Sequence, residues 1–126
     1  MTLTPRTLKV LARVQAVRER SARTGLVRAA ERERALQETA SGLEECRQDA
    51  ASRFGAGAPD ADPRLARHTE RYCEAVGRQL QAMAPEQQAA ADARDEARAR
   101  FVRTTRKSEV LEQKLVEARK AGLPKP

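Results

Sequence analysis

Glycine and proline are concentrated at one place near the middle of this chain. Four of its twelve Gly and Pro residues lie within nine positions of the segment RFGAGAPDADPRL, residues 53–65: Gly55, Gly57, Pro59 and Pro63. No helix interior tolerates this density, because Pro removes a backbone donor and Gly loosens the backbone. We therefore expect a turn over residues 54–62 that separates two long helices.

The composition on either side of the turn predicts helices that bury a narrow stripe. The chain has 126 residues, 34% of them charged, and its aromatic residues are Phe54, Tyr72 and Phe101. It contains no Ile or Trp, and Ala, Arg, Glu, Gln and Leu dominate. This is too little bulky apolar material for an ordinary globular core and is typical of long helices. We predict an all-α chain.

Capping residues indicate where these helices begin and end. Thr4-Pro5 and Asp62-Pro63 each place a capping side chain before a proline at the first helical position. The final AGLPKP supplies Gly and Pro stop signals. We predict helices over residues 5–53 and 63–121, about 73 and 88 Å long at about 1.5 Å per residue, and a short disordered tail over residues 122–126.

In the second predicted helix, apolar residues recur at alternating steps of three and four. Fourteen positions have this spacing: residues 73, 76, 80, 83, 87, 90, 94, 97, 101, 104, 108, 111, 115 and 118. Ten of the fourteen are apolar. This spacing is typical of the buried stripe, or seam, of a coiled coil. Pro85 lies inside this helix and predicts a mild kink.

The first predicted helix carries the same rhythm in two phases. The later phase is interrupted by Glu33 and Arg47 and includes Ala22, Leu26, Ala29, Leu36, Ala40, Leu43, Ala50 and Phe54. An earlier phase is marked by Leu3, Val10, Val14 and Val17. We therefore expect one register slip near Ser21, of the kind that changes local supercoiling without ending a helix.

The turn allows the two stripes to bury each other in an elongated antiparallel coiled-coil hairpin, a single domain over residues 1–126. Opposed residue numbers then sum to about 118, which brings Gly42 near Gly77 for close backbone approach and Cys46 near Cys73. Whether the two thiols form a disulfide stays open. A dimer of straightened chains is the alternative, but a single Gly and Pro cluster favours a hairpin that is a monomer alone.

The sequence offers no catalytic or metal-binding constellation. His68 is the sole histidine, and the two cysteines match no metal-ligand spacing. Gly55 and Gly57 follow a helix rather than a strand and lack the third Gly of a nucleotide-binding loop. We expect neither an enzyme nor a cofactor or metal.

Charge is distributed unevenly along the chain. The net charge is +7, to which residues 1–28 contribute +6, residues 94–126 contribute +5 and residues 29–93 contribute −4. In a hairpin the first two segments meet, which predicts one end near +11 and a loop end near −4. Basic residues interrupt every early apolar run, so we expect no secretory leader, no membrane insertion and a cytoplasmic location.

Helical spacing arranges many of these cations in two stripes. One stripe contains Arg6, Lys9, Arg13, Arg20 and Arg23; the other contains Arg100, Arg103, Lys107 and Lys114, with Phe101 among them. A solvated surface explains any single charge, whereas segregated charge predicts a partner. That partner is either nucleic-acid phosphate or an acidic protein cavity. Nucleic acid is less favoured, because no recognised binding module or aromatic stacking platform is present.

Two segments resemble one known family. Residues 103–120, RTTRKSEVLEQKLVEARK, and residues 8–29, LKVLARVQAVRERSARTGLVRA, are similar in style to the arms of the FliJ/YscO family. Members of that family are helical hairpins that act as central stalks of the flagellar or type III secretion export ATPase. The resemblance covers nearly the whole chain, without an invariant motif.

The resemblance implies a bacterial cytoplasmic protein associated with the secretion apparatus at the inner membrane. Its paired terminal arms would insert into the export ATPase hexamer and couple it to the export gate protein, and the remaining surface would contact the gate or secretion chaperones. The candidate ATPase-binding residues are Arg13, Arg20, Arg23, Arg100, Phe101, Arg103 and Lys107. The alternatives are a basic coiled-coil nucleic-acid-associated protein and a generic scaffold or chaperone-like hairpin.

Overall fold

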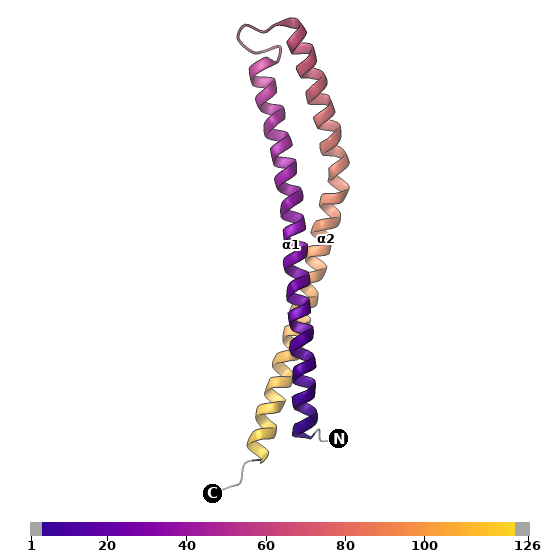
Figure 1. Ribbon diagram of the computed structural model, residues 1–126, viewed down its shortest axis with the longest axis vertical. Helices are drawn as coiled ribbons and strands as arrows, with labels where there is room; N and C mark the ends of the chain where they lie inside the picture. The colour runs from indigo at the N-terminus through magenta and orange to yellow at the C-terminus, as the bar shows by residue number, and fades with distance from the viewer. Residues whose placement is uncertain (1–3, 123–126) are drawn as a thin grey trace. The chain divides into compact units, whose positions relative to one another are not determined.

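Within residues 4–122, which the computed structural model describes, the chain forms two α-helices and no strand. Helix α1 spans Pro5–Phe54 and helix α2 spans Pro63–Gly122, and the two pack against each other as an all-α hairpin (Figure 1). Gly122, expected to begin a tail, is the last residue of α2, and the rest of that predicted tail lies outside the described residues.

Both helices begin at the expected caps. The Thr7 backbone N–H donates to Thr4 Oγ1 at 3.2 Å, and the Arg64 N–H donates to Asp62 Oδ1 at 2.9 Å. Each contact satisfies a backbone donor that has no partner within its own helix. The prolines that follow lack an N–H at a position where none is needed.

The seam predicted for α2 is confirmed. All fourteen positions are buried or half-buried, and Val76 and Ala90 are the most enclosed, with 5% and 4% of their surface exposed. The steps of three and four continue without a change of phase from residue 73 to residue 118. Helix α2 also continues through Pro85.

The register slip predicted for α1 is wrong. Buried and half-buried positions alternate at steps of four and three from Leu8 onward, through residues 12, 15, 19, 22, 26, 29, 33, 36, 40, 43, 47 and 50. Val10, Val14 and Val17, which suggested the other phase, are 55%, 43% and 65% exposed. The uninterrupted seam of α2 explains this, because a partner without a slip holds α1 in one phase. Leu3 lies outside the described residues, and Phe54 is exposed.

Contacts between the helices give the pairing register. Gln15 Nε2 donates to the backbone oxygen of Thr104 at 2.9 Å, and Cys73 Sγ donates to the backbone oxygen of Arg47 at 3.7 Å. Both pairs lie close to the predicted antiparallel register. The expected close approach of two glycine backbones is absent, because a Cβ on Gly42 would meet nothing within 4 Å. A Cβ on Gly77 would meet the Arg47 side chain at 3.5 Å.

Residues of the hairpin group into two compact units. Residues 1–29 and 93–126 form one, here the terminal unit, and residues 30–92 form the other, here the loop unit. The division matches the charge distribution seen in the sequence. No helix within the described residues has a stretch apolar enough to cross a bilayer.

Candidate functional site

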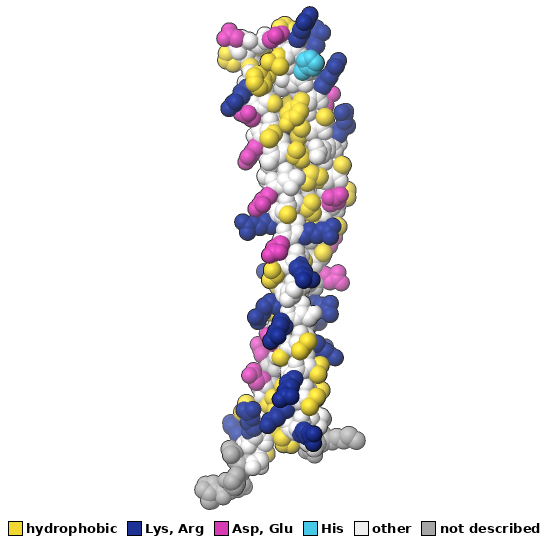
Figure 2. All heavy atoms as spheres, viewed as in Figure 1, with side chains coloured by type: hydrophobic (Ala, Val, Ile, Leu, Met, Phe, Trp, Pro, Cys, Tyr) yellow, Lys and Arg dark blue, Asp and Glu magenta, His cyan; other side chains and the backbone are white. Residues whose placement is uncertain are grey.

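The terminal unit concentrates the basic charge of the protein. It has seventeen basic and six acidic residues, whereas the loop unit has eight basic and twelve acidic residues. On the face drawn in Figure 2, Lys and Arg side chains outnumber acidic ones along the terminal unit. Such a surface attracts an anionic partner over a distance comparable to the Debye length.

The six predicted cations all belong to the terminal unit and are all exposed, but they lie on two sides of it. Arg100, Arg103 and Lys107 share one arc of about 60° around α2 at about 3.6 residues per turn. Arg13, Arg20 and Arg23 lie on α1 and face another side. They are roughly 140° around α1 from those α1 residues that face the same side as the α2 set. A partner with one flat surface cannot contact both sets.

Phe101 belongs to the seam rather than to the open surface. It is half-buried, and the Arg23 guanidinium carbon lies 5.9 Å from its ring centroid. Arg23 also approaches Glu19, with Nη2 3.9 Å from Oε1. Cation–π geometry of this kind contributes modestly at a surface. The ring therefore helps to hold α1 against α2.

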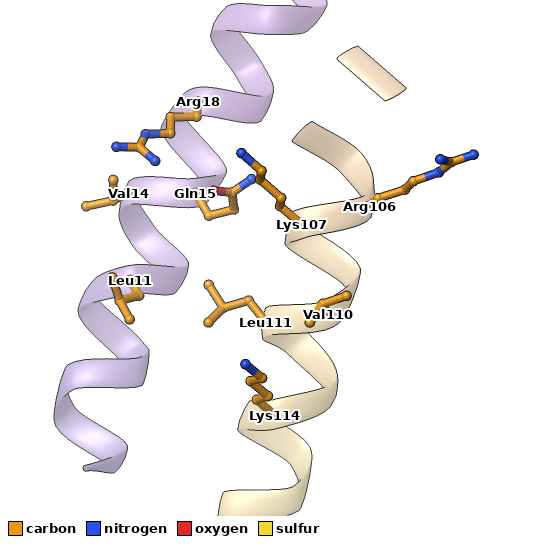
Figure 3. A pocket seen from close by; sticks show the side chains of 9 residues that line it. All are labelled: Leu11, Val14, Gln15, Arg18, Arg106, Lys107, Val110, Leu111 and Lys114. Carbon is orange, nitrogen blue, oxygen red and sulfur yellow. The ribbon is translucent and has the colours of Figure 1, made fainter. Parts of the chain in front are cut away.

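One apolar groove opens along the terminal unit. Its floor and walls contain Leu11 and Val14 of α1 and Val110 and Leu111 of α2, and it encloses about 410 Å³. Leu11, Val14 and Val110 are 40%, 43% and 51% exposed, so their apolar surface faces solvent. In Figure 3, the Leu111 side chain points toward α1, and the Val14 side chain points away from α2.

Cations border this groove, and no acidic residue lines it. In Figure 3, Lys107 points from α2 toward α1, whereas Arg18 points away from α2 and Arg106 points away from α1; Lys114 also lines the groove. The acids of this part of α2 lie elsewhere, since Glu109, Glu112 and Glu117 line a separate depression.

Of the groove residues, Lys107 alone is among the predicted site residues, and Lys114 belongs to a predicted basic stripe. The available signal was the surplus apolar stripe of α1, in which Val10, Val14 and Val17 recur at helical spacing. Because that stripe was predicted to belong to the buried seam, it was not predicted to be exposed. A helix with two apolar stripes, only one of which fits the partner helix, is the pattern that would have indicated a second contact surface.

Depressions in the loop unit have mixed linings, such as the one formed by Arg47, Glu70 and Gly77 with their neighbours. His68 is exposed, and among the described residues no three His, Cys, Asp or Glu side chains cluster as metal ligands. Comparison with protein-family models, with curated proteins and with solved structures gives no match for this chain.

Proposed function

We propose that this chain is a non-catalytic stalk of a type III secretion export ATPase, flagellar or injectisome, which inserts its terminal unit into the ATPase ring and couples it to the export gate. The observation that carries the proposal is the concentration of basic charge in the unit that holds both ends of the chain. The resemblance of residues 8–29 and 103–120 to the FliJ/YscO arms supplies the identity of the partner. Gate and chaperone contacts are then left to the loop unit.

The placement of the predicted cations on two sides of the terminal unit supports a partner that surrounds it. A ring contacts an inserted stalk from all directions, so cations on both sides meet acidic residues. A partner that docks on one surface contacts only one set. Exposed charges of this kind act mainly on association rate and salt dependence.

The test uses the export ATPase of the same organism in pull-down and ATPase-stimulation assays. Two variants each reverse one side, Arg13→Glu with Arg20→Glu, and Arg100→Glu with Arg103→Glu. A control variant reverses exposed cations of the loop unit, Arg67→Glu with Arg71→Glu. We expect both terminal variants to slow binding and reduce stimulation by about tenfold, and the control to retain both. Normal stimulation by both terminal variants would exclude the stalk function.

A second candidate, sequence-independent nucleic-acid binding, follows from the same excess of positive charge. Phosphate binding by counterion release needs neither a base-reading helix nor aromatic platforms. Fluorescence anisotropy with a duplex DNA of random sequence measures it directly. Steeply salt-dependent binding that the terminal variants lose, together with ATPase stimulation that they retain, would replace the stalk by this function.

A further inference from the structure

The apolar groove of the terminal unit lacks an occupant within the described chain. Leu11, Val14 and Val110, which line it, each expose 40% or more of their surface. Val14 also belongs to the exposed stripe formed with Val10 and Val17, whose spacing of four and three residues suits packing against another helix. Apolar surface gathered in a concave strip is more informative than scattered exposed valines.

The shape of the groove fits a helix. It runs between two antiparallel helices, with walls from residues 11–18 of α1 and 106–114 of α2. A third helix laid between two packed helices buries a stripe of its own and completes a three-helix arrangement. The groove spans about two turns at 1.5 Å per residue. A bilayer surface is broad and planar and would not reach the recessed floor.

Charge at the border specifies the chemistry of that helix. Arg18, Lys107 and Lys114 line the groove together with its apolar residues, and no carboxylate lines it. A helix with Asp or Glu beside its apolar stripe would place these carboxylates near the three cations. Such rim contacts favour an acidic partner and oppose a basic one.

A second copy of this chain is a poor occupant of the same groove. In a symmetric dimer, the two grooves would face each other, and the cations bordering one would lie against those bordering the other. Like charges at close range destabilise such a contact.

We propose that the groove formed by Leu11, Val14, Val110 and Leu111 is a docking site for an acidic amphipathic helix of a partner protein. The helix presents apolar residues at positions i, i+3 or i+4, and i+7 to the floor, and acidic residues to Arg18, Lys107 and Lys114. This recognition mode is that of a helix in a groove. It does not rest on the stalk function, because the groove binds or fails to bind such a helix whatever the ATPase does.

The experiment measures binding of a fluorescein-labelled peptide made of three Leu-Glu-Glu-Leu-Glu-Gln-Ala repeats to the full chain by fluorescence anisotropy. We expect saturable binding with a Kd on the order of 10 μM, and binding about tenfold weaker for a peptide with Lys in place of every Glu. Val14→Asp should weaken binding of the acidic peptide about tenfold. Val116→Asp, a matched change at a valine of similar exposure outside the groove, should leave it unchanged.

Charge is tested separately from apolar contact. Lys107→Glu with Lys114→Glu should weaken binding several-fold, and Arg98→Glu with Arg119→Glu, the same change in charge within the same unit, should have a much smaller effect. Circular dichroism checks that each variant retains its helices.

Four results would overturn the proposal. The first is that the acidic peptide shows no saturable binding, and the second is that Val14→Asp and Val116→Asp weaken peptide binding equally. The third is that sedimentation shows a dimer of the chain that Val14→Asp abolishes. The fourth is that the chain binds anionic phosphatidylglycerol vesicles and Val14→Asp abolishes this binding while peptide affinity is retained. The last two would assign the groove to self-association or to a membrane surface.

Discussion

At the residue scale, two positions have side-chain requirements that follow from their surroundings. A Cβ added at Gly55 would collide with the backbone oxygen of Ala51, in the last turn of α1. Gly57, two residues later in the same loop, has open space around it. Gly55 therefore fits a position where the backbone of the turn lies tightly against the helix end, which composition alone did not distinguish from Gly57.

We expect Gly55→Ala to lower the free energy of unfolding by about 1–2 kcal/mol, because the backbone of the turn must shift to accommodate the methyl group. Gly57→Ala is the matched control and should change it by less than about 0.5 kcal/mol. Urea unfolding followed by circular dichroism measures both. Equal effects of the two substitutions would mean that the turn is not held as tightly as the Ala51 contact indicates.

Gln15 is the second such position, because it is a polar side chain buried in the seam. It is 8% exposed and donates to the backbone oxygen of Thr104. A buried polar residue in a seam is tolerated when it is hydrogen-bonded, and it favours one register over others. This contact explains how α1 keeps its phase although Val14 and Val17 are more apolar.

We expect Gln15→Glu to destabilise the hairpin by about 1–3 kcal/mol at pH 7, since an ionised carboxylate cannot donate to the Thr104 oxygen. The folded state should raise the pKa of the new carboxyl above its unfolded value. The variant should then be nearly as stable as the parent below about pH 4 and become less stable as the pH rises through the folded pKa. Thermal melts of both proteins from pH 3 to pH 8 test this, and Gln15→Leu should melt no lower than the parent.

At the element scale, α2 was predictable and the first turns of α1 were not. The α2 seam repeats without a change of phase, so spacing alone located it. In α1 the most apolar stripe and the buried stripe differ, because burial is decided by the partner helix and not by apolar content. The groove was not predicted from the sequence for the same reason. The predicted cations all belong to the terminal unit, but their division between two sides depends on how the helices face each other.

The cysteines test the register of the two helices. Cys73 contacts the backbone of Arg47, the neighbour of Cys46, and both thiols are free. We expect a short bis-maleimide to link Cys46 to Cys73 within one chain. Mild oxidation should likewise form an intrachain rather than an intermolecular disulfide, because the two residues lie on neighbouring turns of α1 and α2. Mass spectrometry of the intact and digested protein identifies the links. A product made only of cross-linked dimers would contradict the antiparallel register.

At the scale of the whole molecule, the main feature is that two units built from the same two helices differ in charge. The terminal unit has a net charge of +11 and the loop unit has −4. Like charges at this density repel one another and destabilise the compact state, and salt screens this repulsion. An acidic partner would neutralise the terminal unit in the same way. Binding of an acidic partner and added salt should therefore stabilise the same residues.

We expect hydrogen exchange to show this difference directly. At low ionic strength, about 10 mM, amides of residues 5–29 and 93–122 should exchange faster than those of 30–54 and 63–92. Raising the salt to about 200 mM should slow exchange mainly in the first two segments, because their mutual repulsion is screened. Mass spectrometry of peptides from the two units gives the comparison within one sample, so the loop unit serves as the internal control for the terminal unit. Equal slowing in both units would show that the excess charge of the terminal unit does not limit its stability. In that case, the acidic groove peptide should slow hydrogen exchange only at the residues that it contacts.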